Sequence, residues 1–323
     1  MRREDVITLL GEDWTAFTDQ MREHLRSDIP LLENTNEKLL FNSGKQLRPM
    51  ISLLVSRSCG KVNFESIRFA AATEMLHHAT LFHDDVADSS SLRRGKPTLS
   101  AMVGPTAAVL IGDFWLSRAV RMIVSMPHQS PVIDLYSKTL SDLAEGEMLQ
   151  MQKASDADTT EEDYLRIIYY KTASLFETAC RVAAISVDAS PELQDAAGRY
   201  AAALGIAFQI RDDIFDYGQG EIGKPVGIDL KERKITLPLI GAMNSASPER
   251  QEHIRQMVRQ IPEHPEYCDE LQQFARSHGG IEYATCRLDD YIEEAVSALA
   301  LFPECPEKEV LAELARYNAV RNK

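Results

Sequence analysis

Hydrophobic residues recur every three to four positions along almost the whole chain, the spacing of helices with an apolar face. Runs in which apolar and polar residues alternate one by one, as they do in β-strands, are almost absent. We therefore expect an all-α protein. The spacing predicts helices over 4–26, 31–42, 48–59, 64–88, 106–127, 131–153, 161–187, 191–217, 235–245, 249–260, 265–278, 280–301 and 305–320.

The predicted helix over 64–88, "FESIRFAAATEMLHHATLFHDDVAD", has small and apolar residues on several faces, as expected for a helix that is buried on most sides. Two loops differ from the rest in composition: "SSSLRRGKPT" (89–98) and "GQGEIGKPVGIDLKERK" (218–234). Each follows a helix end rich in aspartate. Because no fixed-period repeat and no long linker divides the chain, we expect one helical domain over residues 1–323.

The composition, 44% hydrophobic and 26% charged residues, is that of a soluble globular protein. A net charge of −14 argues against a nucleic-acid partner or an anionic membrane, although local arginine clusters can still bind phosphate. No apolar run approaches the roughly 18 residues of a membrane span, and acidic residues near the amino terminus argue against a signal peptide. Five scattered cysteines, none in CxxC spacing, indicate neither disulfides nor zinc. We expect a cytoplasmic protein.

The pattern DDxxD occurs twice, each time towards the end of an apolar helix. At this spacing three carboxylates crowd neighbouring positions of a helix and repel one another. One copy alone is more often a solvated helix end, but two copies, each followed by a basic loop, favour a cation site. The two sets are Asp84, Asp85 and Asp88, and Asp212, Asp213 and Asp216.

Mg²⁺ binds one or two carboxylates together with substrate phosphate oxygens, so the two motifs predict several Mg²⁺ ions around a diphosphate. Metal and arginine would stabilise the negative charge that develops as the diphosphate leaves. Calcium in an EF-hand is disfavoured, because neither motif has the D-x-D-x-D-G loop.

Beyond the two motifs, seven segments stand out along the chain: "GKQLRP" (44–49), "HHATLFHDDVADSSSLRRGKPT" (77–98), "GDFWLSRA" (112–119), "AEGEMLQ" (144–150), "KTASLF" (171–176), "FQIRDDIFDY" (208–217) and "GKPVGIDLKERKITLPL" (223–239). In these segments and in their order, the chain resembles the trans-isoprenyl diphosphate synthases of the medium- to long-chain type, over nearly its whole length.

The resemblance implies an antiparallel helical bundle around a deep central cavity, usually in a homodimer. It also implies head-to-tail condensation of isopentenyl diphosphate onto an allylic diphosphate. In that reaction the allylic diphosphate ionises to an allyl cation, the isopentenyl double bond attacks the cation, and the released diphosphate removes a proton.

The same resemblance assigns roles to individual residues. It implies that Asp84, Asp88 and Asp212 bind Mg²⁺ directly and that Asp85, Asp213 and Asp216 support them. The allylic diphosphate site would comprise Arg93, Lys171, Thr172, Gln209, Lys224 and Lys234. The isopentenyl diphosphate site would comprise Lys45, Arg48, His77 and Arg94. Independently of the family, arginine offers bidentate contact to phosphate, and His77 lies two helical turns before Asp84.

Three positions depart from the family pattern. Gln46 stands where many relatives carry arginine, which removes a positive charge. Arg233 replaces a commoner glycine before Lys234, and Gln150 occupies a place where short-chain relatives tend to have a metal-binding aspartate.

Small residues precede the first motif and predict a long product. Thr80 and Ala79, four and five positions before Asp84, are small where short-chain relatives place an aromatic ring. A tunnel for the growing chain would then continue along Leu76 and Thr73, with Met122 as the candidate for its far end, although core packing is the plainer reading of these apolar residues. We expect an octaprenyl to nonaprenyl product.

Several alternatives remain open at this stage. A shorter, geranylgeranyl product would need only an earlier end to the tunnel. Class I terpene cyclases also ionise prenyl diphosphates with metal, but ordinarily lack a complete second DDxxD and the GKxxRP set. A non-catalytic partner subunit usually has a broken aspartate motif.

Overall fold

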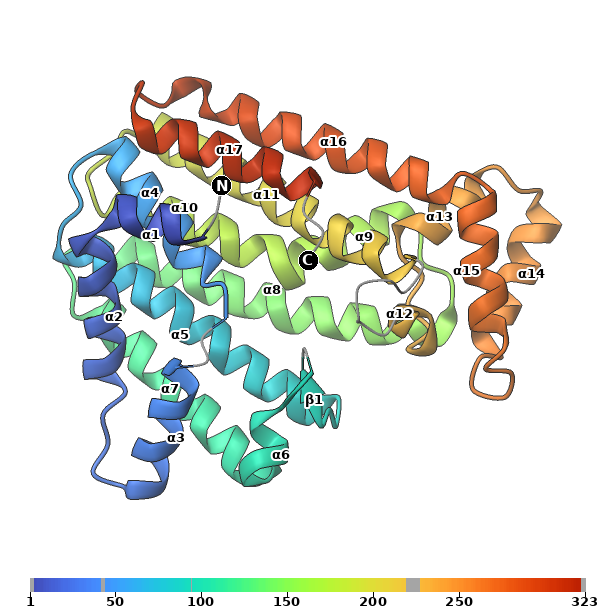
Figure 1. Ribbon diagram of the computed structural model, residues 1–323, viewed down its shortest axis with the longest axis horizontal. Coiled ribbons are helices and arrows are strands. Elements are labelled where there is room, and N and C mark those ends of the chain that lie inside the picture. Colours follow the sequence, from blue (N-terminus) through green and yellow to red (C-terminus); the bar gives the residue numbers. More distant parts are fainter. Residues whose placement is uncertain (1–2, 42–43, 94, 219–226, 321–323) are drawn as a thin grey trace. The chain divides into compact units, whose positions relative to one another are not determined.

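The computed structural model describes residues 3–41, 44–93, 95–218 and 227–320, and helices make up most of it (Figure 1). The prediction of an all-α protein is confirmed. In chain order the elements are α1 (Arg3–Leu10), α2 (Glu12–His24), α3 (Pro30–Phe41), α4 (Leu47–Cys59), α5 (Phe64–Ala87), β1 (Leu92–Arg93), β2 (Lys96–Pro97), α6 (Leu99–Val103), α7 (Pro105–Val124), α8 (Gln129–Asp156), α9 (Glu161–Ile168), the π-helical turn η1 (Tyr169–Ala173), α10 (Ser174–Ile185), α11 (Pro191–Asp216), α12 (Ile228–Lys231), α13 (Leu237–Asn244), α14 (Pro248–Arg259), α15 (Tyr267–Ser277), α16 (Gly280–Ala298), the 3-10 turn η2 (Leu299–Leu301) and α17 (Pro306–Val320).

The chain forms two compact units. Unit 1 comprises residues 1–137, 178–198 and 301–313, and unit 2 comprises 138–177, 199–300 and 314–323. Helices α8, α10, α11 and α17 contribute residues to both. The first aspartate motif belongs to unit 1 and the second to unit 2. One domain over residues 1–323 stays a prediction.

Helix α5 is the core of unit 1. Asn63 begins it with a capping box, in which its side chain accepts from the amide of Ser66 and the Ser66 hydroxyl accepts from the amide of Asn63. From Phe69 to Leu76 every residue is buried, and α7 packs along the helix. This agrees with the small and apolar residues that the sequence places on several of its faces. Glu74 is the one charged residue inside this buried stretch, and the aspartates of the first motif lie beyond it, at the carboxyl end of α5.

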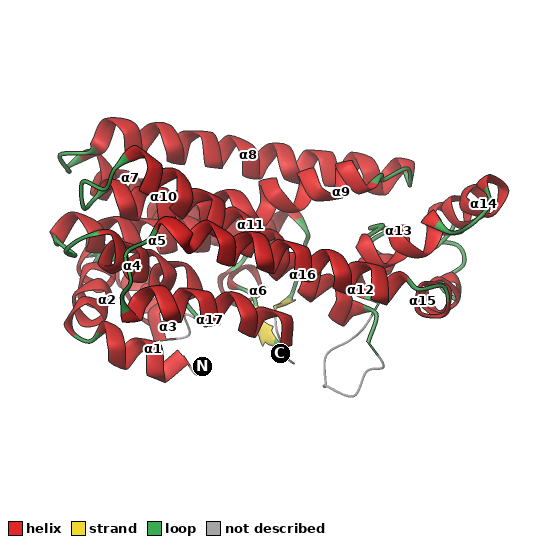
Figure 2. Cartoon of the chain, turned by 90° about the horizontal axis from the view of Figure 1, so that it is seen from above, coloured by secondary structure: helices red, strands yellow, loops and turns green. Residues whose placement is uncertain are grey.

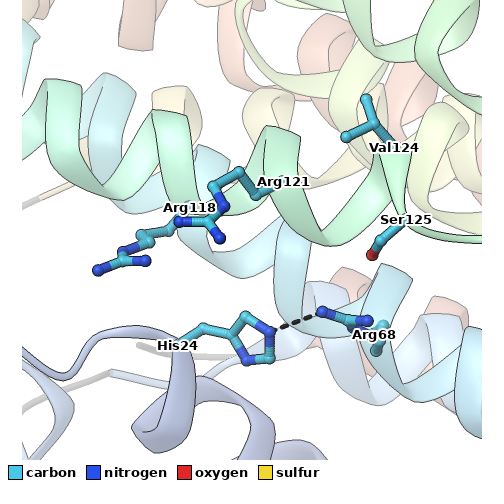
Figure 3. Close-up of a pocket in the computed structure, with 6 residues that line it drawn as sticks. All are labelled: His24, Arg68, Arg118, Arg121, Val124 and Ser125. Carbon is cyan, nitrogen blue, oxygen red and sulfur yellow. Dashed lines mark hydrogen bonds between the residues drawn. The ribbon is translucent and has the colours of Figure 1, made fainter.

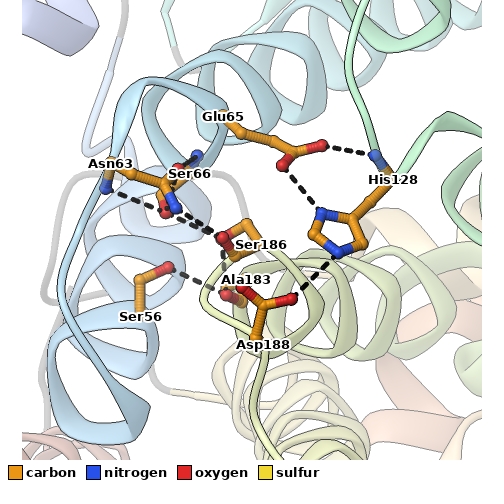
Figure 4. A network of polar contacts seen from close by, with 8 residues as sticks. All are labelled: Ser56, Asn63, Glu65, Ser66, His128, Ala183, Ser186 and Asp188. Carbon is orange, nitrogen blue, oxygen red and sulfur yellow. Dashed lines mark hydrogen bonds and ion pairs between the residues drawn. The ribbon is translucent and has the colours of Figure 1, made fainter.

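A network of polar contacts lies at the amino-terminal end of α5 (Figure 4). The carboxylate of Glu65 accepts from the backbone amide of His128 at 2.9 Å and contacts its Nδ1 at 2.8 Å. This bond raises the pKa of His128, whose Nε2 lies 3.2 Å from Asp188. Ser66 and Ser186 share a hydroxyl–hydroxyl bond of 2.7 Å. The network joins α5 to the segments that follow α7 and α10.

In unit 2, glycines allow helices to touch. A Cβ on Gly280, the first residue of α16, would lie 2.0 Å from the carbonyl oxygen of Pro238 in α13. A Cβ on Gly241 would lie 2.7 Å from the Tyr283 side chain. Neither site can hold a larger residue without moving a helix, so the close packing of α13 on α16 depends on glycine.

The structure differs from the predicted elements in five places, one of which is the short helix α6, in a segment for which no helix was predicted. The helix expected over 4–26 is broken at Gly11, whose φ of 53° suits glycine. Residues 161–187 are interrupted by η1. The loop 89–98 contains the short antiparallel hairpin β1–β2, seen in Figure 2, and the loop 218–234 contains α12. Among the described residues, no helix is both long enough and apolar enough to cross a membrane.

Candidate active site

The first aspartate motif lies at the carboxyl end of α5. Asp84 is half-buried, Asp85 is buried with 3% of its surface exposed, and Asp88 is the exposed C-cap. Hairpin β1–β2 turns the chain back so that Arg93 Nε donates to Asp85 Oδ1 at 2.7 Å. One aspartate of the motif therefore holds an arginine.

Arg93 has more N–H donors than its hydrogen bond to Asp85 uses. A guanidinium group has five N–H donors, and its bond to Asp85 uses the one on Nε. The side chain is 42% exposed, so the other end of its fork can meet an anion. The adjacent Arg94, predicted to bind isopentenyl diphosphate, lies outside the described residues, as does Lys224 of the allylic set.

Three residues of the predicted isopentenyl diphosphate site belong to unit 1. Arg48 Nη1 lies 3.1 Å from His77 Nε2, which joins α4 to α5. Because guanidinium only donates, Nε2 of the ring accepts, and the ring proton is on Nδ1. Lys45 is exposed in the loop before α4. Arg48 and His77 therefore act as a pair, with the histidine orienting the arginine.

Arg3 reaches this loop from α1. Its Nη2 donates to Gln46 Oε1 at 2.9 Å, and its Nε donates to the Lys45 carbonyl at 3.1 Å. Gln46 has a φ of 51°, a left-handed conformation that is uncommon for a residue with a side chain. A guanidinium group thus lies beside Gln46, where the family resemblance would place an arginine. The sequence offered no sign of this, because 42 residues separate Arg3 from Lys45.

The second aspartate motif ends α11 in unit 2, and the protein holds two of its three carboxylates. Asp213 is buried and accepts from Tyr164 Oη at 2.6 Å and from Gln209 Nε2 at 2.8 Å. Asp216 accepts from the backbone amides of Ile228 and Asp229 at 3.1 and 3.0 Å, at the start of α12. Asp212, the first of the motif, is half-buried.

Two further predicted residues connect to this motif. Thr172 Oγ1 donates to Gln209 Oε1 at 3.0 Å, so one chain of bonds runs from Thr172 through Gln209 to Asp213. Thr172 and Lys171 lie in η1, and such π-helical turns are frequent at functional sites. Lys171 forms an ion pair with Glu147 of α8. The structure thus brings Lys171, Thr172, Gln209 and the second motif together within unit 2.

Close packing holds η1 in place. A Cβ on Gly146 of α8 would lie 2.7 Å from Tyr170 Cβ, and one on Gly205 of α11 would lie 2.6 Å from Ala173 Cα. These glycines let two helices approach the backbone on either side of Lys171 and Thr172.

Negative charge is concentrated around the second motif. Burial raises the pKa of Asp213 well above its ordinary value, and nearby Asp229 adds to the shift. Burial and the charge of Asp216 raise the pKa of Asp229 to about 7. Burial lowers the pKa of Lys234, but its ion pair with Glu232 and the charges of Asp229 and Glu147 together raise that pKa above its ordinary value. A cation near these carboxylates would relieve their repulsion.

The oxygen donors of the two motifs fit Mg²⁺. Within the described part of the chain, no group of three or more histidine, cysteine, aspartate or glutamate residues is placed to hold a metal ion. Mg²⁺ does not require such a group, since it takes one or two carboxylates and completes its shell with waters and substrate phosphate oxygens. Asp84 and Asp88 in unit 1 and Asp212 in unit 2 would supply those carboxylates.

The residues expected to line a tunnel lie in the core of unit 1. Ala79, Leu76 and Met122 are buried, and Thr80 is half-buried. The Thr73 hydroxyl, further along α5, is hydrogen-bonded to the phenol of Tyr136 on α8, which also donates to the Phe69 carbonyl at 3.3 Å. Tyr136 is a large buried side chain beside the predicted path.

Four residues of these sites were not foreseen: Arg3, Tyr136, Tyr164 and Asp229. Asp229 had a visible signal, because it is an acidic residue in the basic segment 223–239 that carries part of the family resemblance. Nothing in the sequence pointed to Tyr136 or Tyr164, because the importance of each is evident only from the residue that its hydroxyl contacts.

Known proteins resemble this chain in sequence and in fold. The sequence model of the family described as "Polyprenyl synthetase" matches residues 29–274. The chain is 37% identical to the octaprenyl diphosphate synthase of Escherichia coli (strain K12) over 325 residues, covering 100% of each protein.

Solved structures show the same fold. A decaprenyl diphosphate synthase from Rhodobacter capsulatus superposes with a TM-score of 0.92 at 33% identity, covering 100% of both chains. A polyprenyl synthase from Caulobacter crescentus, complexed with calcium and isoprenyl diphosphate, superposes with a TM-score of 0.89 at 32% identity, covering 100% of this chain and 98% of that one. The chain therefore belongs to the polyprenyl synthetase family and is a trans-prenyltransferase.

Proposed function

We propose that this trans-prenyltransferase condenses isopentenyl diphosphate head-to-tail with an allylic diphosphate, and that it makes an octaprenyl to nonaprenyl product. The proposal rests on a feature that the two DDxxD motifs have in common. In each, the protein's own donors hold the second aspartate, Arg93 for Asp85 and Tyr164 with Gln209 for Asp213. The first aspartate of each motif is half-buried at a helix end. We infer that the first aspartate of each motif is a metal ligand, whereas protein donors hold the second aspartate and, in the second motif, Asp216 as well.

The reaction needs a diphosphate that can leave. Mg²⁺, when bound, would act as a Lewis acid on the diphosphate oxygens. Asp84, Asp88 and Asp212 would hold the ions, and Asp85, Asp213 and Asp216 would hold the helix ends in position. The remaining N–H groups of Arg93, with Lys171, Lys224 and Lys234, would stabilise the charge that develops on the diphosphate. Thr172 and Gln209 would position it by hydrogen bonds.

Isopentenyl diphosphate would bind to Lys45, Arg48, His77 and Arg94. Arg48 is oriented by its bond to His77, which restricts the arginine to one direction. Such positioning brings the double bond to the cation without the entropy cost of a chance encounter. The departing diphosphate would take the proton lost in the last step.

Incubation with farnesyl diphosphate, isopentenyl diphosphate and Mg²⁺, followed by mass spectrometry, tests the proposed reaction. We expect consumption of both substrates and an all-trans product of eight or nine isoprene units. A terpene cyclase would consume farnesyl diphosphate alone, a non-catalytic subunit would consume neither, and a geranylgeranyl synthase would stop at four units.

Arg3 gives a second test. Replacing Arg3 by alanine removes the guanidinium beside Gln46, so we expect the KM for isopentenyl diphosphate to rise about tenfold, as for the loss of one charge-assisted hydrogen bond. The KM for the allylic substrate should change little. Steady-state kinetics with each substrate varied in turn measures both.

An arginine at position 46 should restore the positive charge that Arg3→Ala removes. In the Arg3→Ala, Gln46→Arg double variant the arginine stands at the family position, and we expect most of the affinity to return. Arg22→Ala, on the exposed face of α2, serves as the control. Equal increases in both KM values, or no rescue by Gln46→Arg, would show that Arg3 only supports the loop.

Tyr136 is proposed to limit chain length beside Met122. Replacing Tyr136 by alanine opens space next to Thr73, and we expect longer products than the wild-type enzyme makes under the same conditions. Because the change also creates a core cavity, stability should fall by about 3–5 kcal/mol. Tyr136→Phe, which keeps the ring, should leave product length unchanged. Mass spectrometry of the products distinguishes the variants.

We also propose that the protein is a cytoplasmic homodimer. All five cysteines are free thiols, which suits a reducing compartment. Helices α6 and α7 expose Met102, Val109 and Leu110, large apolar side chains that a second copy of the chain would cover. Light scattering after size-exclusion chromatography tests the dimer, and Leu110→Glu should weaken it.

A further inference from the structure

A second group of cations lies in unit 1, among residues that the proposed reaction does not use. His24 at the end of α2, Arg68 on α5 and Arg118 and Arg121 on α7 line a pocket of about 350 Å³, together with Val124 and Ser125 (Figure 3). Figure 3 shows Arg118 and Arg121 extending from α7 opposite His24 and Arg68. Three guanidinium groups around one pocket are unexpected in a chain of net charge −14.

The imidazole of His24 anchors one of these cations. Arg68 Nη2 lies 2.6 Å from His24 Nε2, and His24 Nδ1 lies 3.0 Å from the Gln20 carbonyl. Because guanidinium only donates, Nε2 accepts and Nδ1 donates, so the ring is neutral. Burial lowers the pKa of His24, and the charges of Arg68 and Arg118 lower it further. The histidine therefore orients Arg68 without adding charge.

Glu23 is a neighbouring acid, but it does not form an ion pair with the guanidinium groups of this pocket. Within the described ranges, none of Arg68, Arg118 and Arg121 forms an ion pair with a carboxylate, and the buried Nε of Arg68 has no hydrogen-bond partner. Burial lowers the pKa of Arg68, which Glu23 opposes only in part. Arg118 donates weakly to the Arg26 carbonyl, at 3.5 Å, and lies over the Phe114 ring. A bound anion would satisfy these donors.

We propose that this pocket binds the phosphate groups of a small anion, for which diphosphate is the best match. A diphosphate carries several negative charges and many acceptor oxygens, and guanidinium groups bind phosphate through paired hydrogen bonds. A phosphate-bearing lipid headgroup would present the same chemistry. The site is separate from the DDxxD motifs, and its existence does not depend on the proposed function.

Calorimetric titration of the full-length protein with inorganic diphosphate in EDTA tests the pocket, because chelation removes metal-dependent binding at the aspartate motifs. We expect Arg118→Gln, Arg121→Gln to weaken one class of binding by about tenfold for each guanidinium lost. The Arg118→Lys, Arg121→Lys double variant keeps the positive charges but loses the paired N–H groups of guanidinium, and it should weaken diphosphate binding less. Arg22→Gln, Arg250→Gln removes the same charge from exposed sites and should have no effect.

Flotation with vesicles of phosphatidic acid or phosphatidylcholine separates the two sources of phosphate. Retention on phosphatidic acid alone, lost in the glutamine double variant, assigns the pocket to a headgroup, whereas diphosphate binding without retention assigns it to the free anion. The proposal is overturned if the glutamine double variant binds diphosphate and vesicles as the wild type does, or if the Arg22, Arg250 control loses binding equally. Initial rates without added diphosphate should stay at the wild-type value in the pocket variants, so the proposed function is judged separately.

Discussion

Replacing Asp84 or Asp212 by alanine should lower kcat by a factor of about 10³ while the far-UV circular dichroism stays that of the wild type. Each is the half-buried first aspartate of its motif, so its loss removes a proposed metal ligand and also relieves the crowding of carboxylates on one helix. The rate falls because the charge on the leaving diphosphate is no longer neutralised, and single interactions of this kind are worth factors of about 10² to 10³. Steady-state turnover with farnesyl and isopentenyl diphosphates measures the effect.

The second position of the same motif provides the contrast. Asp213 accepts hydrogen bonds from Tyr164 and Gln209 inside unit 2, so Asp213→Ala leaves buried donors without partners and should destabilise the fold by a few kcal/mol. Asp269→Ala, on the exposed face of α15, should change neither turnover nor stability. The metal assignment fails if Asp84→Ala or Asp212→Ala keeps its turnover, or if either unfolds as Asp213→Ala is expected to do.

Replacing Ala79 by tyrosine should shorten the product from eight or nine isoprene units to about three or four. Position 79 lies about one turn of α5 before Asp84, on the proposed path of the growing chain. A ring there would close the tunnel near its entrance. Radiolabelled products separated by thin-layer chromatography, with masses confirmed, report the length.

The stability of the Ala79→Tyr variant shows whether the ring fills a tunnel or crowds a closely packed core. If space for a prenyl chain lies beside Ala79, the tyrosine ring occupies it and the melting temperature changes little; in a closely packed core, it costs about 1–3 kcal/mol. Ala87→Tyr places the same ring at an exposed position of the same helix and should leave the product unchanged. Thr80→Phe, at a half-buried neighbour, gives a second obstruction. Wild-type chain length in folded Ala79→Tyr and Thr80→Phe enzymes would refute the tunnel direction.

The functional class could be predicted from short segments of sequence because its chemistry depends on residues close together in the chain. DDxxD places carboxylates on one helix end by local geometry alone, and the helical spacing of apolar residues gave the all-α class for the same reason. The departures from the predicted elements are also local: Gly11 breaks the first helix because glycine tolerates a φ of 53°.

Tertiary structure decided which residues meet. Arg93 pairs with Asp85 because hairpin β1–β2 folds back onto α5, and Arg3 reaches Gln46 across 43 residues of sequence. Tyr136 of α8 meets Thr73 of α5 across 63 residues of sequence. His24, Arg68, Arg118 and Arg121 come from three helices, and no spacing in the sequence connects them. A periodic pattern shows which face of a helix is buried, but the partner of each polar group depends on long-range packing. The sequence alone therefore determined the helical class and the reaction chemistry, whereas the partners of Arg93 and Arg3 and the second basic pocket emerged only from the folded chain.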